Sequence, residues 1–131
     1  MAELFSKEWT DNFMAFWNEE PELIKPLEKA RFTQVIGYGF DKQDKPEAYV
    51  SIENGKIVSA GIYTDQKLDL DVRCGKSQWR KWIKKPPGMV SMGMAFTAGK
   101  VKLKVGDYKA ILKDSRVGSS FIHSFSVMAR A

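Results

Sequence analysis

The stretch that decides the fold begins with AYVSIENGKIVSAGIY at residues 48–63 and ends with KVKLK at residues 100–104. Its first part holds two apolar runs that flank Asn54-Gly55. Asn-Gly is the strongest local signal for a two-residue hairpin turn, because both turn residues of type I′ need a positive φ. The first part therefore predicts a pair of antiparallel strands.

The next segment, TDQKLDLDVRC at residues 64–74, alternates in polarity. Its leucines and its valine fall on one side of a strand, while Asp69, Asp71 and Arg73 fall on the other. Such alternation is typical of a strand with one buried and one solvated face. We therefore expect the two aspartates to face water, with Arg73 near enough to neutralise them.

The remaining part of the stretch is rich in Trp, Met and Lys. SQWRKWIKKPPGMVSMGMAFTAG at residues 77–99 is expected to be helical on both sides of Pro86-Pro87-Gly88, because proline interrupts a helix. This break is a natural place for a pocket wall to shift. KVKLK then predicts an edge strand whose lysines form a cationic outer face.

Further helices and one strand flank this stretch. Ser6 is a suitable N-cap for the first helix, and Pro21 is suited to the first position of the second. The expected elements are helices at residues 7–18, 107–113 and 119–129, a second helix from Pro21, and a strand at residues 32–40. The chain is therefore expected to be α+β, with a five-stranded, mostly antiparallel sheet covered by helices on one face.

The order of these segments resembles the sterol carrier protein 2 family over roughly residues 32–115. The segments that carry the resemblance are Val50–Lys56, Leu68–Val72, Trp79–Lys85, Met94–Phe96, Gly99–Leu103 and Gly106–Tyr108. The resemblance implies a sterol-carrier-type fold with an apolar tunnel between helices and sheet. It also implies lipid binding and lipid transfer, with a fatty acid, fatty acyl-CoA or sterol as ligand. Residues 1–131 would form one such domain, with residues 1–30 as an added helical pair.

Composition agrees with a small protein of one domain. The chain has 131 residues and a net charge of +5, from 21 basic and 16 acidic side chains. No window has 18 consecutive apolar residues, and the N-terminus lacks the pattern of a signal peptide. The single Cys74 suits a reducing compartment, so we expect a cytoplasmic protein.

An apolar group on the predicted helices and the last strand forms the candidate ligand pocket. Methionine adapts to ligands of varied shape, so a wall rich in Met and Trp suits an acyl chain or a polycyclic lipid. The alternative is a well-filled core, and the family resemblance favours the cavity. The candidate pocket residues are Trp79, Trp82, Ile83, Met89, Met92, Met94, Phe96, Leu103, Phe121, Phe125 and Met128.

Basic residues beside the tryptophans are candidates for the polar end of a ligand. Arg80, Lys84 and Lys85 are placed to bind a carboxylate, CoA phosphates or an anionic membrane surface. The alternative is a solvated charged face. A lipid-metabolising enzyme is a further candidate partner, whereas no nucleic-acid-binding module is found.

Catalytic residues are hard to assemble from this sequence. The only histidine, His123, has no orienting partner that sequence can name, and Cys74 has no adjacent base. No metal-ligand spacing is present, and no cofactor is expected. The sequence therefore favours a carrier. The rival is a small enzyme or accessory subunit that acts on an acyl or steroid-like substrate in the same pocket, and a desolvated polar pair there would favour it.

Overall fold

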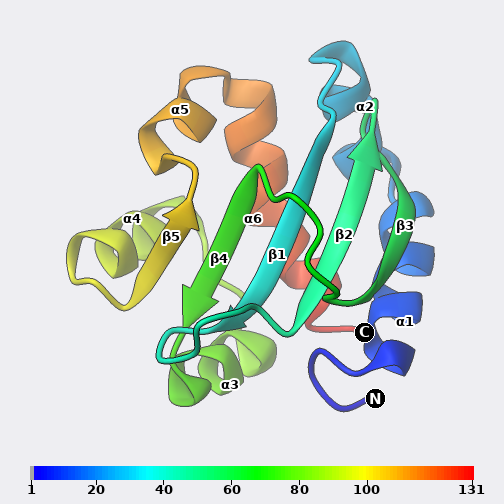
Figure 1. Ribbon diagram of the computed structural model, residues 1–131. Coiled ribbons are helices and arrows are strands. Elements are labelled where there is room, and N and C mark those ends of the chain that lie inside the picture. Colours follow the sequence, from blue (N-terminus) through cyan, green and yellow to red (C-terminus); the bar gives the residue numbers. More distant parts are fainter. Residues whose placement is uncertain (1) are drawn as a thin grey trace.

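The computed structural model describes residues 2–131 as six helices and five strands (Figure 1). Their bounds lie close to those expected, and the last helix begins four residues earlier than predicted. The helices are α1 (Lys7–Asn18), α2 (Pro21–Lys29), α3 (Lys76–Lys84), α4 (Met89–Thr97), α5 (Tyr108–Lys113) and α6 (Ser115–Met128). The strands are β1 (Gln34–Phe40), β2 (Ala48–Glu53), β3 (Lys56–Ile62), β4 (Leu70–Cys74) and β5 (Val101–Val105).

The five strands form one sheet in the order β3-β2-β1-β4-β5. The pair β1–β4 is parallel and the other three pairs are antiparallel, which confirms the expected mostly antiparallel sheet. The connection from β3 to β4 crosses the front of the sheet (Figure 1). This crossing places Leu70–Cys74 beside β1, and so puts a strand from the second half of the chain next to the central strand of the sheet.

The hairpin turn has the geometry that its sequence predicts. Asn54 has a φ of 46° and Gly55 a φ of 87°, as a type I′ turn requires. A Cβ on Gly55 would lie 2.8 Å from the amide nitrogen of Glu28, so α2 packs directly on the turn. The indole of Trp17 donates a 2.8 Å hydrogen bond to the Gly55 carbonyl, which also ties α1 to this turn.

The helices gather behind the sheet around α6, which contacts each of the other five helices (Figure 1). Ser6 caps α1 by accepting a hydrogen bond from the Trp9 amide, as predicted. Apolar residues of α1 and α2 belong to the same core as those of the sheet and α6. The fully buried side chains from these elements include Phe13, Leu23, Tyr38, Val50, Val72 and Val127.

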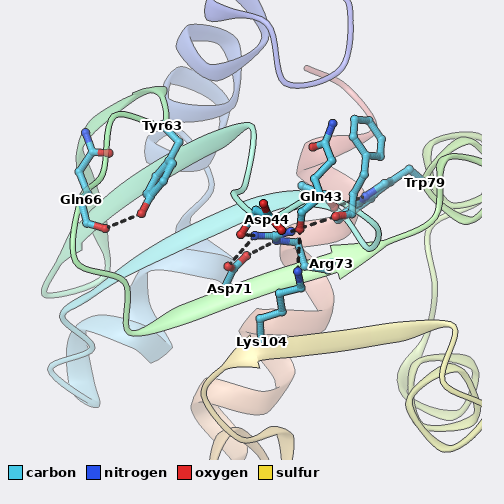
Figure 2. Close-up of polar contacts among 10 residues, drawn as sticks. Gln43, Asp44, Tyr63, Gln66, Asp71, Arg73, Trp79 and Lys104 are labelled. Carbon is cyan, nitrogen blue, oxygen red and sulfur yellow. Dashed lines mark hydrogen bonds and ion pairs between the residues drawn. The ribbon is translucent and has the colours of Figure 1, made fainter.

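The opposite face of the sheet is covered by loops, and here one expectation is wrong. Asp71 and Arg73 are buried at 4% and 0% exposure instead of facing water. They form a bidentate ion pair, and Arg73 also donates hydrogen bonds to the carbonyls of Phe40, Gln43 and Asp44 (Figure 2). Alternation alone could not show that the loop at residues 41–47 folds over this side of the strand. The expected neutralisation of Asp71 by Arg73 is confirmed, whereas Asp69 remains exposed.

Two glycines make room for these loops on the front of β1. A Cβ on Gly39 would lie 2.8 Å from the Cα of Pro46, and a Cβ on Gly37 would lie 2.8 Å from a methyl carbon of Leu68. A Cβ at position 39 would press on the backbone of the loop, whereas a Cβ at position 37 would meet side-chain atoms. The glycines of this strand therefore mark a close approach, which seals the front of the sheet and leaves the back for the candidate site.

Candidate functional site

A small apolar cavity lies between the back of the sheet and the helices. Its volume is about 10 Å³, which is near the minimum needed for one water molecule. The helices are therefore closed over the sheet in this structure. The residues that line the cavity are Trp17, Leu27, Phe32, Ile36, Tyr38, Leu70, Ile111, Val117, Phe121 and Ser124.

The side chains of this lining carry three polar groups. They are the hydroxyls of Tyr38 and Ser124 and the indole N–H of Trp17, which already donates to the Gly55 carbonyl. Burial raises the pKa of Tyr38, so its hydroxyl stays protonated at neutral pH. The Ser124 hydroxyl donates a 2.5 Å hydrogen bond to the carbonyl of Phe121 within α6. The lining holds no charged side chain. A buried ligand anion would therefore lack a counter-charge there, and burying an unpaired charge is costly.

A wider hollow adjoins the cavity under α5. It has a volume of about 250 Å³ and shares Phe32, Leu70, Ile111 and Val117 with the cavity lining. These four side chains thus form a common wall between the hollow and the closed cavity. Helix α5 has only six residues and follows Gly106, whose φ is 96°. Of the residues in the common wall, Ile111 lies on α5, Val117 on α6 and Leu70 on β4.

Gln34 lines this hollow and carries an unusual polar atom. Its Oε1 is buried, and within residues 2–131 it has no hydrogen-bond partner. A buried acceptor without a donor costs about 1–3 kcal/mol. A hydroxyl or amide donor on a bound molecule would satisfy it.

The predicted pocket residues lie in several places. Phe121 is the member of that group that lines the enclosed cavity. Trp79, Trp82, Phe121 and Phe125 pack on one another, with ring centroids 5.3–6.4 Å apart. Met92 and Met128 are buried, whereas Ile83, Phe96 and Leu103 are partly buried at the edge of the core. Met89 and Met94 of α4 are 48% and 67% exposed.

A second, open groove lies between α3, α4 and the start of β5. Its volume is about 240 Å³, and Trp82, Met94 and Ala95 supply much of its apolar lining. The cations on this groove are Lys81 and Lys100. Arg80 lines a different hollow, beside Phe5 and Phe40. Lys84 and Lys85 are exposed and line none of the hollows described here.

Most of the cavity lining was not identified as a site from the sequence. Ile36 and Leu70 were visible only as apolar positions of alternating strands, and Trp17 and Leu27 only as the apolar sides of helices. These patterns predict burial but not a cavity. Whether facing side chains meet or leave a space depends on the distance between layers, which local pattern does not determine.

Cys74 and His123, the two candidate reactive residues, lie in surroundings that fit a structural role. Cys74 is buried, and burial raises the pKa of its thiol, which is the opposite of an activated nucleophile. His123 lies on α6 with its Nε2 3.9 Å from a carboxylate oxygen of Glu20. Glu22 is also close, but Arg130 pairs with the other oxygen of Glu20 at 3.1 Å. The tertiary structure thus brings potential ligands together around His123, and a competing cation already holds one of them.

Comparison with solved structures identifies the fold. A crystal structure of sterol carrier protein 2 superposes with a TM-score of 0.78 at 15% identity, covering 98% of this chain and 99% of that one. A conserved hypothetical protein of Thermus thermophilus, possibly a sterol carrier protein, gives 0.65 at 15% identity, covering 96% and 90%. The ubiquinone synthesis protein UbiJ-SCP2 gives 0.63 at 11% identity, covering 98% and 93%. The chain therefore has the sterol carrier protein 2 fold.

Sequence comparison adds no relative to this result. No protein-family model matches the chain, and no curated protein matches it either. Identities of 15% and below carry the fold and leave the function to the site itself. Throughout residues 2–131, no helix combines the length and the apolar character needed to cross a bilayer.

Proposed function

We propose that this protein binds and carries a lipid whose buried part is apolar and uncharged. The observation that carries the proposal is the enclosed cavity between sheet and helices, whose lining holds no charged side chain. The similarity to sterol carrier protein 2 supports the same reading. A desolvated polar pair would have favoured the enzyme alternative. The two hydroxyls of the lining belong to Tyr38, whose pKa is raised by burial, and to Ser124, which is bonded to the Phe121 carbonyl within α6.

Binding requires the cavity to open, because about 10 Å³ is far too small for an acyl chain. The wall shared with the hollow under α5 is the proposed place of opening. Moving Ile111 and Val117 outward would admit a chain beside Phe121 and toward the ring cluster of Phe125 and Trp82. Each buried methylene contributes about 0.8 kcal/mol, which would offset the cost of opening.

The polar end of the ligand would lie in the hollow under α5. The unpaired Oε1 of Gln34 would accept a hydrogen bond from a ligand hydroxyl there, while Asp69 and Asp107 contribute negative charge to the same hollow. These groups favour a neutral hydroxyl over a carboxylate. The proposed ligand class is therefore a sterol-like or long-chain alcohol. The alternative site for an anionic end is the group of Arg80, Lys84 and Lys85.

Displacement of a fluorescent lipid tests both parts of this proposal. A dansyl-labelled fatty alcohol should bind saturably to the full chain and be released by unlabelled long-chain alcohol. The carboxylic acid of equal chain length should compete about tenfold more weakly at neutral pH, since burying its charge without a partner costs about 1.4 kcal/mol or more. Gln34→Leu should weaken binding of the alcohol, because it removes the acceptor of the hydroxyl, and so reduce this preference.

A matched pair of substitutions places the site. Val117→Phe adds a ring where the cavity and the hollow meet and should weaken binding at least about tenfold. Val58→Phe on the exposed part of β3 should leave binding unchanged. Equal affinities in both variants would contradict the cavity. A preference for the carboxylic acid that Lys84→Glu with Lys85→Glu removes would place the polar end at the basic group instead.

A further inference from the structure

The charges of this protein are strongly segregated. Residues 75–106 carry eight basic side chains and no acidic one, whereas the rest of the chain carries 13 basic and 16 acidic side chains. This basic lobe, which comprises α3, α4 and β5, lies at the end of the sheet away from β3 and α2 (Figure 1). The net positive charge of the protein therefore resides in one lobe.

Helix α4 presents an uncharged apolar surface within the basic lobe. None of its residues, Met89–Thr97, is charged. Val90 and Met94 are 76% and 67% exposed, while Met92 and Ala95 anchor the helix on the core. Exposed apolar side chains grouped in this way are typical of contact with a protein or a membrane.

The polar side chains of α4 are satisfied by the helix itself. Ser91 accepts a hydrogen bond from the Gly88 amide, and its hydroxyl also lies 3.2 Å from the Gly88 carbonyl. The Thr97 hydroxyl donates to the carbonyl of Gly93. Neither side chain needs water or a partner molecule. Both side chains would keep these hydrogen bonds if the helix entered an apolar environment.

Lysines mark both ends of this apolar helix. Lys84 and Lys85 precede it, and Lys100 follows it, and all three are exposed. Lysine ammonium groups at the edge of an apolar surface suit the headgroup level of a bilayer, while Val90 and Met94 suit the acyl boundary beneath. Nucleic acid would match the lysines but would leave the apolar centre of the surface unmatched.

We infer that the basic lobe is a docking surface for anionic bilayers, with α4 entering the interface and Lys84, Lys85 and Lys100 binding lipid phosphates. The inference goes beyond ligand binding, because it requires neither an open nor an occupied cavity. It gives the cations beside the tryptophans a partner other than the carried lipid. Docking to a membrane would then use the basic lobe, and carrying of the lipid would use the cavity.

Vesicle co-sedimentation of the full chain tests the docking surface. The protein should bind vesicles of an equal mixture of phosphatidylcholine and phosphatidylglycerol and bind phosphatidylcholine alone much more weakly. Val90→Ser with Met94→Ser should weaken binding roughly tenfold. Lys84→Gln with Lys100→Gln should weaken it about twentyfold, and added salt should reproduce that effect.

Matched controls exist on the other side of the molecule. Val58→Ser with Ile62→Ser changes apolar residues of β3 that are 49% and 48% exposed, and Lys25→Gln with Lys29→Gln removes two exposed lysines of α2. Both control pairs should bind vesicles like the unchanged protein. Displacement of the fluorescent alcohol should be unaffected in all α4 variants, and Val117→Phe should still bind vesicles, so docking and ligand binding can fail separately.

Three results would overturn the docking surface. The first is equal binding to neutral and anionic vesicles. The second is equal loss of binding in the α4 variant and its β3 control, or in the lysine variant and its α2 control. The third is tighter binding to duplex DNA than to anionic vesicles, sensitive to the lysine pair but not to Val90→Ser with Met94→Ser.

Discussion

The two faces of the sheet are built on opposite principles. The front is closed by loops held through polar contacts. Arg73 joins Asp71 to the Phe40 carbonyl at the end of β1 and to the loop carbonyls of Gln43 and Asp44, and Lys104 donates a 2.6 Å hydrogen bond to the Gln43 carbonyl (Figure 2). The back is closed by helices packed through apolar side chains and holds the cavity. Hydrogen bonds depend on direction and distance, whereas apolar contacts can be exchanged for one another.

This difference suits the proposed opening of the cavity, in which the sheet stays in place while the helices move. An ion pair with further bonds to backbone fixes the loop at residues 41–47 against β1 and β4. On the back, Ile111 of α5 lines the cavity together with Ile36 and Leu70. The front is thus held by directed polar contacts, and the back is packed through apolar ones.

Removing the buried arginine should have the largest effect on stability. Arg73→Met leaves the Asp71 carboxylate buried without a counter-charge, and we expect a loss of about 3–5 kcal/mol in the free energy of unfolding. Urea denaturation would measure the loss. Asp71→Leu in the same chain should recover much of it, because the unpaired charge is then removed as well.

The exposed ion pair at the start of α6 is the control for this effect. Arg116→Ala removes the partner of Asp114, and both side chains are at least a third exposed. The expected loss is much smaller than that of Arg73→Met, because water screens an exposed ion pair. A similar loss for Arg73→Met would show that the loop-covered face does not depend on its buried pair.

Adding one methyl group should have opposite effects on stability at the loop-covered face and in helix α4. Gly39→Ala brings a Cβ to 2.8 Å from the Cα of Pro46, and we expect a loss of about 1–3 kcal/mol because backbone cannot yield easily. Gly93→Ala in α4 meets no atom within 4 Å and should stabilise by about 0.5–1 kcal/mol through helix propensity. Thermal unfolding of both variants would check the opposite signs. Equal effects would contradict the close approach at β1.

Alkaline pH should lower the free energy of unfolding by a smaller amount, through two buried groups on the helix-covered face. Burial raises the pKa of Cys74 and of Tyr38 above their ordinary values of 9.0 and 10.0. Below the ordinary pKa, the group is neutral in both the folded and the unfolded chain, and the folded state keeps its full stability. As the pH rises above the ordinary pKa, the group ionises only in the unfolded chain, and this stability is lost. We expect a loss of about 1.4 kcal/mol per pH unit from the thiol above about pH 9. Cys74→Ala should remove this slope between about pH 9 and pH 10, and a flat profile in the unchanged protein would contradict the prediction.

The local elements follow from the sequence because each depends on contacts a few residues apart. Ser6 identifies the start of α1, and Asn54-Gly55 identifies the hairpin turn through the dihedral angles that these residues accept. The family resemblance supplied the arrangement of helices over a sheet, and the comparisons with solved structures bear it out. The apolar side of each helix was also readable from its period.

Only the tertiary structure decided which polar groups are buried and where the cavity lies. Arg73 alternates like a solvated residue, yet a loop about thirty residues earlier supplies the carbonyls that make its burial favourable. Trp17, Leu27 and Ile111 meet around one space although they lie on three different helices. Local pattern states that a side chain is apolar and on which face it lies. The distance between layers, and so the choice between contact and cavity, is set by the packing of all the elements together.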